Sequence, residues 1–512
     1  MSFFYEGSLT CTLNQRKIGV AISYLNLAFN IIVGLVYTPF MISKLGDGQY
    51  GIFTLCNSLI SLVTLLDLGF GQTLVRYISK TRANLDIGEE HKLNGLFIKL
   101  YSTISVLAFI IGIGIILFYP QLAKKSFSPE EMCLFRTVFS ILLVNVVISF
   151  PLSVFSATLN AYEQFFFLKS ISFLMNVLKY LAMFLLLMYG HKLIAIAVVT
   201  LCASIVTQFS YVIYAVKKIG IKFDFTKTDS DLSREIIHFS FFIFLNLIID
   251  FLYSNTDNLI LGVVAGTVAV SIYSIGVYFS QFFGELSNAM SGVFLPKIMY
   301  LYEKKDMHEI SNLFNRVGRL QMVMLFLFLG GYFCLGKEFI GLWVGPTYRD
   351  SYIIGVLIML PSIIPLTQNI GISVLRAMNI HKYRSYMYIV IAIINVIISI
   401  PLSMKFQGIG AAFGTFIGTL LGQIIFMNWF YARRVHIKIS EYWKNYKKFF
   451  IISVITGIIV FGIKSYLIIN SWFSFALMVL IYSLIYFVFY WCFVANSYEK
   501  SLILNFAHLK RG

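Results

Sequence analysis

Long apolar runs alternate with short polar loops along the whole chain of 512 residues. A helix that crosses a bilayer needs about 20 mostly apolar residues, because its internal hydrogen bonds satisfy the backbone in hydrocarbon. About 14 runs meet this length, which predicts an all-α polytopic membrane protein. We place them at residues 17–42, 50–70, 93–118, 132–155, 165–188, 192–216, 236–262, 266–292, 316–338, 351–373, 384–404, 409–431, 447–468 and 472–495.

Lys and Arg are divided unevenly between alternate loops. One set of loops is rich in them, at residues 76–99, 217–234, 297–319, 376–384 and 433–448. Cytoplasmic loops carry an excess of Lys and Arg, so this set predicts the cytoplasmic side, with both termini in the cytoplasm. The chain has 40 Lys and Arg against 23 Asp and Glu, and the basic cytoplasmic loops account for this excess of positive charge. Nucleic-acid binding would need that charge on one soluble face, and we expect none.

The cysteines and the loop lengths exclude further classes of function. The six cysteines are scattered, mostly inside the apolar runs, and no pair has metal-ligand or redox spacing. We therefore expect no disulfide framework, no metal site and no cofactor. The first run lacks a small-residue cleavage site, so we expect a retained helix rather than a signal peptide. The loops are too short for a catalytic domain, so we expect a protein that is not an enzyme.

Several weak internal matches recur in the same order, which suggests a duplicated chain. A gapless shift of 220 residues places Asn26 on Asn246 and Asn30 on Asp250. Six spans in each half make the repeat parallel, with its axis along the membrane normal and a central cavity between two similar six-helix bundles. The expected domains are residues 1–230 (spans 1–6 and a cytoplasmic linker), 231–435 (spans 7–12) and 436–512 (two extra C-terminal spans and a cytoplasmic tail).

Polar side chains recur at helical spacing within five of the runs. Asn246, Asp250, Tyr253 and Asp257 follow i, i+4, i+7 and i+11 on one helical face. Such a stripe can join helices by hydrogen bonds or line a polar cavity, and its recurrence in both halves favours the cavity. The other stripes are Ser23, Asn26, Asn30 and Tyr37; Ser172, Asn176 and Lys179; Gln281, Glu285 and Asn288; and Pro361, Pro365, Gln368 or Asn369, and Arg376.

Charged side chains deep in the runs are the strongest functional candidates. A charge at mid-bilayer costs roughly 2.5–3.5 kcal/mol even on lenient insertion scales, so it is usually functional or paired. Lys179 lies about two-thirds of the way along its run and Asp250 lies near the middle of another. A cavity-facing role is favoured for Lys179; the alternatives are an ion pair with Asp250 or Asp67, or snorkelling to the interface. Lys464, near the outer end of its run, is expected to snorkel.

Three segments resemble a known family. Residues 45–51 (Leu-Gly-Asp-Gly-Gln-Tyr-Gly), 65–77 (Leu-Leu-Asp-Leu-Gly-Phe-Gly-Gln-Thr-Leu-Val-Arg-Tyr) and 255–262 (Asn-Thr-Asp-Asn-Leu-Ile-Leu-Gly) resemble the signature of the bacterial polysaccharide (O-antigen type) flippases. These belong to the multidrug/oligosaccharidyl-lipid/polysaccharide exporter superfamily, and the resemblance extends over roughly residues 15–500. It implies alternating-access transport of an undecaprenyl-pyrophosphate-linked oligosaccharide across the bacterial plasma membrane. It also implies membrane lipids, a polysaccharide polymerase and glycosyltransferases as partners.

The motif at residues 65–77 also has a physical interpretation. Gly69 and Gly71 loosen the helix, so that Asp67 can meet a partner and Arg76 can reach the cytoplasmic headgroups. An alternative is that Asp67 and Arg76 only fix how the second span ends.

The candidate site residues divide into two groups. The substrate-binding candidates are Lys179, Asn176, Asn26, Asn30, Arg76 and Arg376. The coupling-ion candidates are Asp250, Asp257, Glu285 and Asp67.

Two further functions compete with a flippase for lipid-linked glycans. A cation-coupled multidrug or metabolite antiporter of the same superfamily would use Asp250, Asp257 and Glu285 as cation sites. The two extra C-terminal spans and the motif at residues 65–77 argue against it. A polytopic glycosyltransferase or polymerase would need acidic residues in a sizeable external loop, whereas the external loops here are short. The sequence therefore favours transport in the biosynthesis of O-antigen, capsule or exopolysaccharide.

Overall fold

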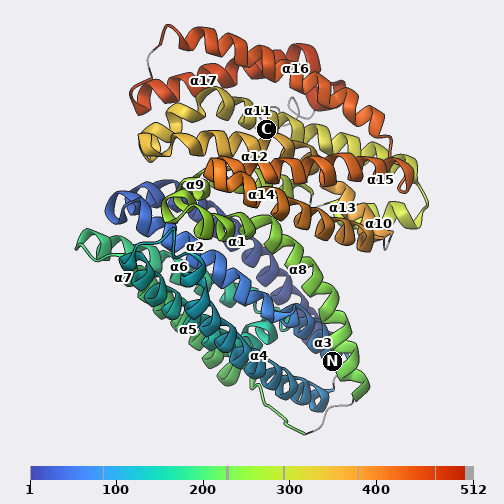
Figure 1. Cartoon of the computed structure of the whole chain (residues 1–512). Coiled ribbons are helices and arrows are strands. Elements are labelled where there is room, and N and C mark those ends of the chain that lie inside the picture. Colours follow the sequence, from blue (N-terminus) through green and yellow to red (C-terminus); the bar gives the residue numbers. More distant parts are fainter. Residues whose placement is uncertain are drawn as a thin grey trace. The chain divides into compact units, whose positions relative to one another are not determined.

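The computed structural model describes residues 2–84, 86–226, 230–291, 294–378, 380–467 and 469–501. The side chains of residues 2–17 and of scattered helical positions, among them Asn246, Asp250 and Tyr253, lie outside the described part. Within that part the regular elements are all helices, so the predicted all-α class is confirmed (Figure 1). The chain divides into two compact units, Met1–Ser271 and Ile272–Gly512. The domain limits predicted at residues 230 and 435 stay predictions.

The first unit, called unit 1, is a bundle of long helices. In it α4 packs on α5, α5 on α7, and α6 on both α1 and α7, while α8 packs on α2. Its elements are α1 (Ser2–Leu45), α2 (Asp47–Thr64), η1 (Leu65–Asp67), α3 (Phe70–Ala83), α4 (Ile87–Leu122), α5 (Pro129–Ala161), α6 (Phe165–Met188), α7 (Leu193–Tyr214), η2 (Ala215–Ile219), α8 (Ser230–Val264) and the start of α9 (Thr267–Ser291).

The second unit, called unit 2, is built around α11, which packs on α12, α16 and α17. The two C-terminal spans predicted outside the repeat, α16 and α17, therefore belong to this unit. Its elements are the rest of α9, α10 (Leu295–Glu303), α11 (Met307–Trp343), η4 (Pro346–Tyr348), α12 (Arg349–Thr367), α13 (Ile370–Ala377), α14 (His381–Gly418), η5 (Thr419–Phe426), α15 (Met427–Arg433), α16 (Ile439–Lys464), α17 (Trp472–Phe489) and η6 (Tyr490–Val494).

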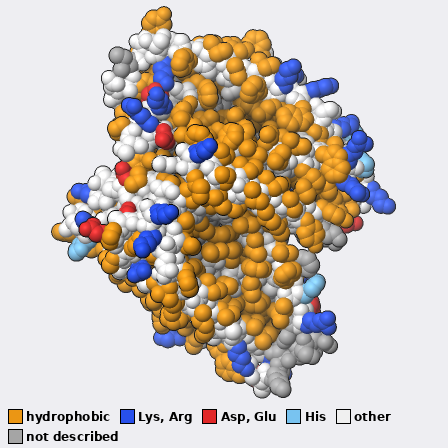
Figure 2. Space-filling view, in the orientation of Figure 1, with side chains coloured by type: hydrophobic (Ala, Val, Ile, Leu, Met, Phe, Trp, Pro, Cys, Tyr) orange, Lys and Arg blue, Asp and Glu red, His pale blue; other side chains and the backbone are white. Residues whose placement is uncertain are grey.

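The helices are long and apolar enough to lie in a membrane. Among the described residues, 12 helices could cross one, or up to 13 if the bent pair Arg234–Ile249 and Ser254–Val264 is a single span. One of them, Tyr383–Arg433, contains a break at Gln407 and covers both runs predicted at 384–404 and 409–431. The exact number of 14 stays a prediction. Figure 2 shows a face covered largely by hydrophobic side chains, which suits lipid contact.

Local sequence signals set where these helices begin and break. Ser128 and Glu131 form a capping box at the start of α5, so the first orphan N–H groups are satisfied. Pro361 and Pro365 lie inside α12, which ends at Thr367, two residues after the second proline. The polar residues that follow are thus placed at a break between α12 and α13.

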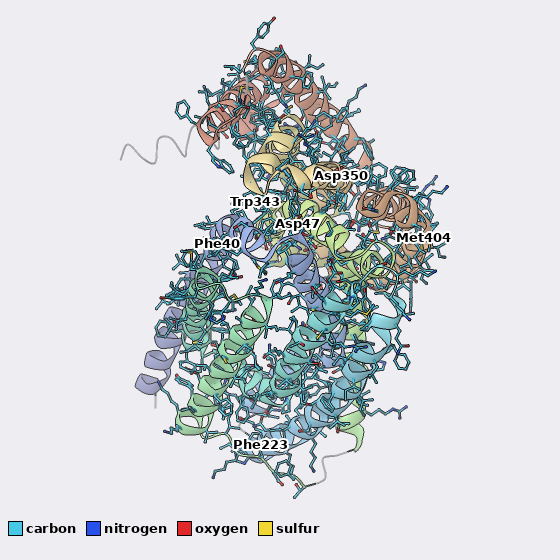
Figure 3. The ribbon with its side chains drawn as sticks, turned by 60° about the vertical axis from the view of Figure 1, so that its left-hand side comes forward. Phe40, Asp47, Phe223, Trp343, Asp350 and Met404 are labelled. Carbon is cyan, nitrogen blue, oxygen red and sulfur yellow. The ribbon has the colours of Figure 1, made fainter. Side chains whose placement is uncertain are left out.

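The loops of unit 1 gather at two opposite ends of its helices. At one end, Ser126 Oγ donates to a carbonyl near the end of α8 (2.7 Å). At the other, the backbone N–H of Asp224 donates to the His91 carbonyl (2.9 Å). Figure 3 shows Phe223 at the opposite end of unit 1 from Phe40. The Lys-rich linker at 217–226 and the loop after α1 are therefore separated by the length of the bundle.

The predicted orientation has a direct test in exposed loop positions. Single cysteines at Lys124 and Lys337, in a background without native cysteines, are expected to react with impermeant thiol reagents from outside the cell. Cysteines at Lys222, Lys304 and Arg434 are expected to stay unlabelled until the membrane is permeabilised. All five side chains are exposed, so accessibility reports the side of the membrane. Labelling of the Lys222 position from outside would reverse the assigned orientation.

Candidate functional site

A polar pocket opens between α6 and α7 within unit 1. Its volume is about 270 Å³. Helix α6 contributes one cation and two smaller polar groups, and α7 contributes five hydroxyl or amide side chains. The lining residues are Ser172, Met175, Asn176, Lys179, Thr200, Ala203, Ser204, Thr207, Gln208 and Tyr211.

Asn176 connects this pocket to α1. Its Nδ2 donates to Asn26 Oδ1 (3.1 Å) and to Asn30 Oδ1 (2.9 Å). Three predicted substrate-binding residues from two helices thus form one hydrogen-bonded cluster. Because the two asparagines of α1 are one turn apart, a single amide on α6 reaches both.

Lys179 is the only cation among the residues lining this pocket. Its Nζ lies 4.6 Å from the ring centre of Tyr180, close enough for a cation–π interaction. Within the described residues, no ion pair joins Lys179 to a carboxylate. The proposed partner Asp67 instead accepts a hydrogen bond from Tyr101 Oη (2.7 Å), while the side chain of Asp250 lies outside the described residues.

Asp67 lies at a sharp break between α2 and α3. Leu68 and Gly69 both have left-handed backbone angles, with φ of 52° and 76°. The expected loosening of the helix is therefore seen, and Tyr101 of α4 is the partner that Asp67 meets. This geometry accounts for Asp67 as a residue that fixes the break, and its role in ion coupling stays a prediction.

The remaining candidates lie outside the unit 1 pocket. Arg76 is exposed on α3, with its guanidinium carbon 4.1 Å from the Phe239 ring centre on α8. Asp257 is buried on α8. Glu285 and Arg376 are exposed on α9 and α13 of unit 2. The functions predicted for these four residues remain predictions.

The polar face of α7 is absent from the stripes predicted from the sequence. Thr200, Ser204, Thr207 and Gln208 have the i, i+4, i+7 and i+8 spacing of one helical face, so the signal is present. Single hydroxyls are common in membrane helices, where they bond to the preceding turn, as Thr200 Oγ1 does to the Ile196 carbonyl (2.8 Å). Only the position of α7 opposite α6 shows that these side chains line a pocket, unlike other hydroxyls of membrane helices.

A larger apolar groove lies within unit 2, between α11, α12 and α16. Its volume is about 650 Å³. The walls are almost entirely hydrophobic, and Ser453 is the one Ser or Thr among the lining residues. The lining residues are Phe326, Leu329, Gly330, Phe333, Cys334, Tyr352, Val356, Leu360, Phe450, Ser453, Val454, Gly457, Ile458 and Phe461.

Comparisons with known proteins agree with this architecture. The chain is 23% identical over 499 residues to the uncharacterized membrane protein EpsK of Bacillus subtilis (strain 168), covering 93% of this chain and 95% of that protein. The structure resembles the lipid II flippase MurJ in an inward closed conformation, with a TM-score of 0.70, 18% identity, and 92% and 98% of the two chains covered.

It also resembles an inward-facing multidrug resistance transporter of the MATE family, with a TM-score of 0.64, 13% identity, and 83% and 98% coverage. At these identities, the two structural similarities establish a shared fold. A family model described as polysaccharide biosynthesis protein matches residues 19–301, more than half of the chain. The chain therefore belongs to the polysaccharide biosynthesis protein family.

Proposed function

We propose that this protein is a flippase in the plasma membrane of bacteria. It would move an undecaprenyl-pyrophosphate-linked oligosaccharide from the inner to the outer leaflet by alternating access, for O-antigen, capsule or exopolysaccharide synthesis. One observation carries the proposal: a lysine lies among amides and hydroxyls in a pocket between two long apolar helices. The family match and the similarity to a protein named as a lipid II flippase support it.

The chemistry of the unit 1 pocket suits a pyrophosphate. An ammonium group deep in a membrane protein is costly, and a bound anion offsets that cost. Lys179 offers three N–H donors to phosphate oxygens, and charge-assisted hydrogen bonds are about twice as strong as neutral ones. Asn176 and the hydroxyls of α7 can contact a neighbouring sugar without requiring one particular glycan.

The apolar groove of unit 2 suits the other end of such a substrate. An isoprenoid chain is a long hydrocarbon, and the lining of the groove is hydrophobic over most of its length. Because lipid tails are as apolar as these side chains, contact there costs no desolvation of polar groups. Taken by itself, the groove therefore suits a hydrocarbon tail.

Substitutions of Lys179 test the proposal. The purified protein in lipid vesicles is given undecaprenyl-pyrophosphate-linked N-acetylglucosamine with a fluorescent label on the sugar, and a membrane-impermeant quencher reports the labelled sugars that reach the outer leaflet. Lys179→Gln is expected to lower the initial rate at least about tenfold, since one charge-assisted hydrogen bond is worth about 1.5–3 kcal/mol. Lys179→Arg should keep much of the rate because it keeps the charge.

Lys169→Gln is the matched control, because Lys169 is an exposed lysine on the same helix outside the pocket. It should leave the rate unchanged. Thermal stability is measured for each variant, because a lysine held in a structural ion pair would lower stability when it is replaced. Full transport by Lys179→Gln would remove this residue from the mechanism, and no transport by the wild-type protein would reject the flippase function.

A cation-coupled multidrug antiporter is the second candidate. The similarity to a MATE family transporter and the buried carboxylate of Asp257 favour it. Expression in cells lacking their own exporters separates the two functions. An antiporter would lower the accumulation of cationic dyes in a gradient-dependent manner, whereas a glycan flippase should leave dye accumulation unchanged.

A further inference from the structure

A second polar pocket lies inside unit 2, formed by α9, the break between α12 and α13, α14, η5 and α15. Its volume is about 200 Å³. Carboxamides, two tyrosines and one arginine surround it, together with a few apolar side chains. The lining residues are Asn288, Pro365, Leu366, Gln368, Asn369, Ile372, Arg384, Tyr388, Gln423, Met427 and Tyr431.

Arg384 gives the pocket its charge, since no other Lys, Arg, Asp or Glu lines it. The residue lies in the first turn of α14, and its guanidinium carbon is 4.3 Å from the ring centre of Tyr388, one turn further along. That contact orients the guanidinium plane. Arg376, the arginine predicted from the sequence, is exposed on α13 and does not line the pocket.

Hydrogen bonds hold the carboxamides in place. Asn369 Nδ2 donates to Asn288 Oδ1 (2.6 Å), and Gln368 Nε2 donates to Asn428 Oδ1 (2.9 Å). Gln368 is 1% exposed, so its amide is fixed by the protein rather than by solvent. The interruption of the helix after Pro365 places Gln368 and Asn369 at the break, where both line the pocket. Side chains fixed in this way bind a ligand with little further loss of entropy.

The set of groups indicates the class of ligand. Amides and tyrosine hydroxyls both donate and accept hydrogen bonds, as sugar hydroxyls do. A guanidinium matches a planar carboxylate through two parallel hydrogen bonds. The proposed function assigns the pyrophosphate to Lys179 of unit 1, which leaves a carboxylate on the glycan as the anion for Arg384. The volume lies below the range of about 300–1,000 Å³ for whole-ligand pockets, so it suits one ring of a larger molecule.

We propose that this unit 2 pocket binds one carboxylate-bearing sugar, such as a hexuronate, within the glycan of the transported lipid. The proposal rests on the proposed flippase function and deepens it by naming a substrate class. Arg384 holds the sugar carboxylate, while Asn288, Asn369 and Gln423 contact its hydroxyls. The pocket thereby selects acidic glycans, and the pyrophosphate is bound elsewhere.

Three fluorescent substrates test this assignment in the vesicle assay. They are undecaprenyl-pyrophosphate linked to N-acetylglucosamine alone, to glucosyl-N-acetylglucosamine, and to glucuronyl-N-acetylglucosamine. Arg384→Gln is expected to slow transport of the glucuronyl substrate at least about tenfold, the loss of one charge-assisted hydrogen bond. Transport of the other two substrates should change less than about twofold. Arg384→Lys should give an intermediate loss, because it keeps the charge and loses the paired donors.

Arg434→Gln is the control, since Arg434 is an exposed arginine of the same unit that does not line the pocket. Equal slowing of all three substrates by Arg384→Gln would overturn the proposal and indicate a role in folding or pyrophosphate binding. Unchanged transport of the glucuronyl substrate would overturn it as well. Binding of the same three substrates to detergent-purified protein is measured in parallel. If the wild-type protein binds them without moving them, the flippase function fails, and the binding preference for the glucuronyl substrate still decides the assignment of the pocket.

Discussion

Replacing Glu499 with Gln is expected to lower the free energy of unfolding by about 3–5 kcal/mol, because it leaves a buried arginine without its counter-charge. Arg319 of α11 binds Glu499 through two parallel hydrogen bonds, from Nε to Oε1 (2.7 Å) and from Nη2 to Oε2 (2.8 Å). Both side chains are almost fully buried, with 10% and 3% exposed. A charge removed from water is stabilised only by such partners.

The same cluster fixes the chain after the last span. Arg319 Nη1 also donates to Asn445 Oδ1 of α16 (2.7 Å), and Nη2 donates to the Val494 carbonyl (2.9 Å). Tyr490 Oη donates to Glu499 Oε2 (3.1 Å). One guanidinium thus joins α11, α16 and the segment that follows α17. Loss of the pair should free that segment as well as lower stability.

A second ion pair of unit 2 provides the matched control. Lys464 Nζ lies 2.8 Å from Glu338 Oε1, and both side chains are partly exposed, at 21% and 22%. Glu338→Gln should cost about 1 kcal/mol or less, because solvent screens the charges. Unfolding titrated with denaturing detergent measures both variants. Equal costs for Glu499→Gln and Glu338→Gln would contradict the prediction. The double variant Arg319→Met with Glu499→Leu should recover much of the stability, since no buried charge then remains.

The partners in these two ion pairs could not be predicted from the sequence. The apolar runs predict the membrane helices because hydrocarbon imposes a length and composition that can be counted. Arg319 belongs to a basic loop by its place in the sequence, yet it is buried against Glu499, 180 positions away. Lys464 is predicted to snorkel to the interface, and the sequence does not indicate that it also forms an ion pair with Glu338. Partners brought together only by folding leave no periodic signal in the sequence.

The candidate site is predictable to the extent that helical spacing defines a face. That spacing groups Asn176 with Lys179, and the structure brings both to one pocket and bonds Asn176 to α1. The arginine of the unit 2 pocket is not predicted, because Arg384 lies in a basic stretch that topology already explains. Its importance emerges only when the helix break near Pro365 places carboxamides opposite it.

Replacing Gly69 with Ala is expected to cost about 2–5 kcal/mol of stability, from two additive causes. Gly69 has φ of +76°, a left-handed conformation that costs about 1–2 kcal/mol with a side chain. A Cβ there would also lie 2.4 Å from Ile243 Cγ2 of α8, and overpacking of this kind costs about 1–3 kcal/mol. The glycine therefore lets the break after Asp67 pack directly against α8.

Gly190→Ala separates the two causes, because Gly190 has a similar φ of +85° and no atom within 4 Å of an added Cβ. It should show the conformational cost alone, about 1–2 kcal/mol. Thermal unfolding and detergent titration of the two variants give the difference directly. Leu68, next to Gly69, already has a left-handed φ of 52°, so the backbone here tolerates a side chain where space allows. If Gly69→Ala proves no more costly than Gly190→Ala, contact with Ile243 is not what requires glycine in this motif.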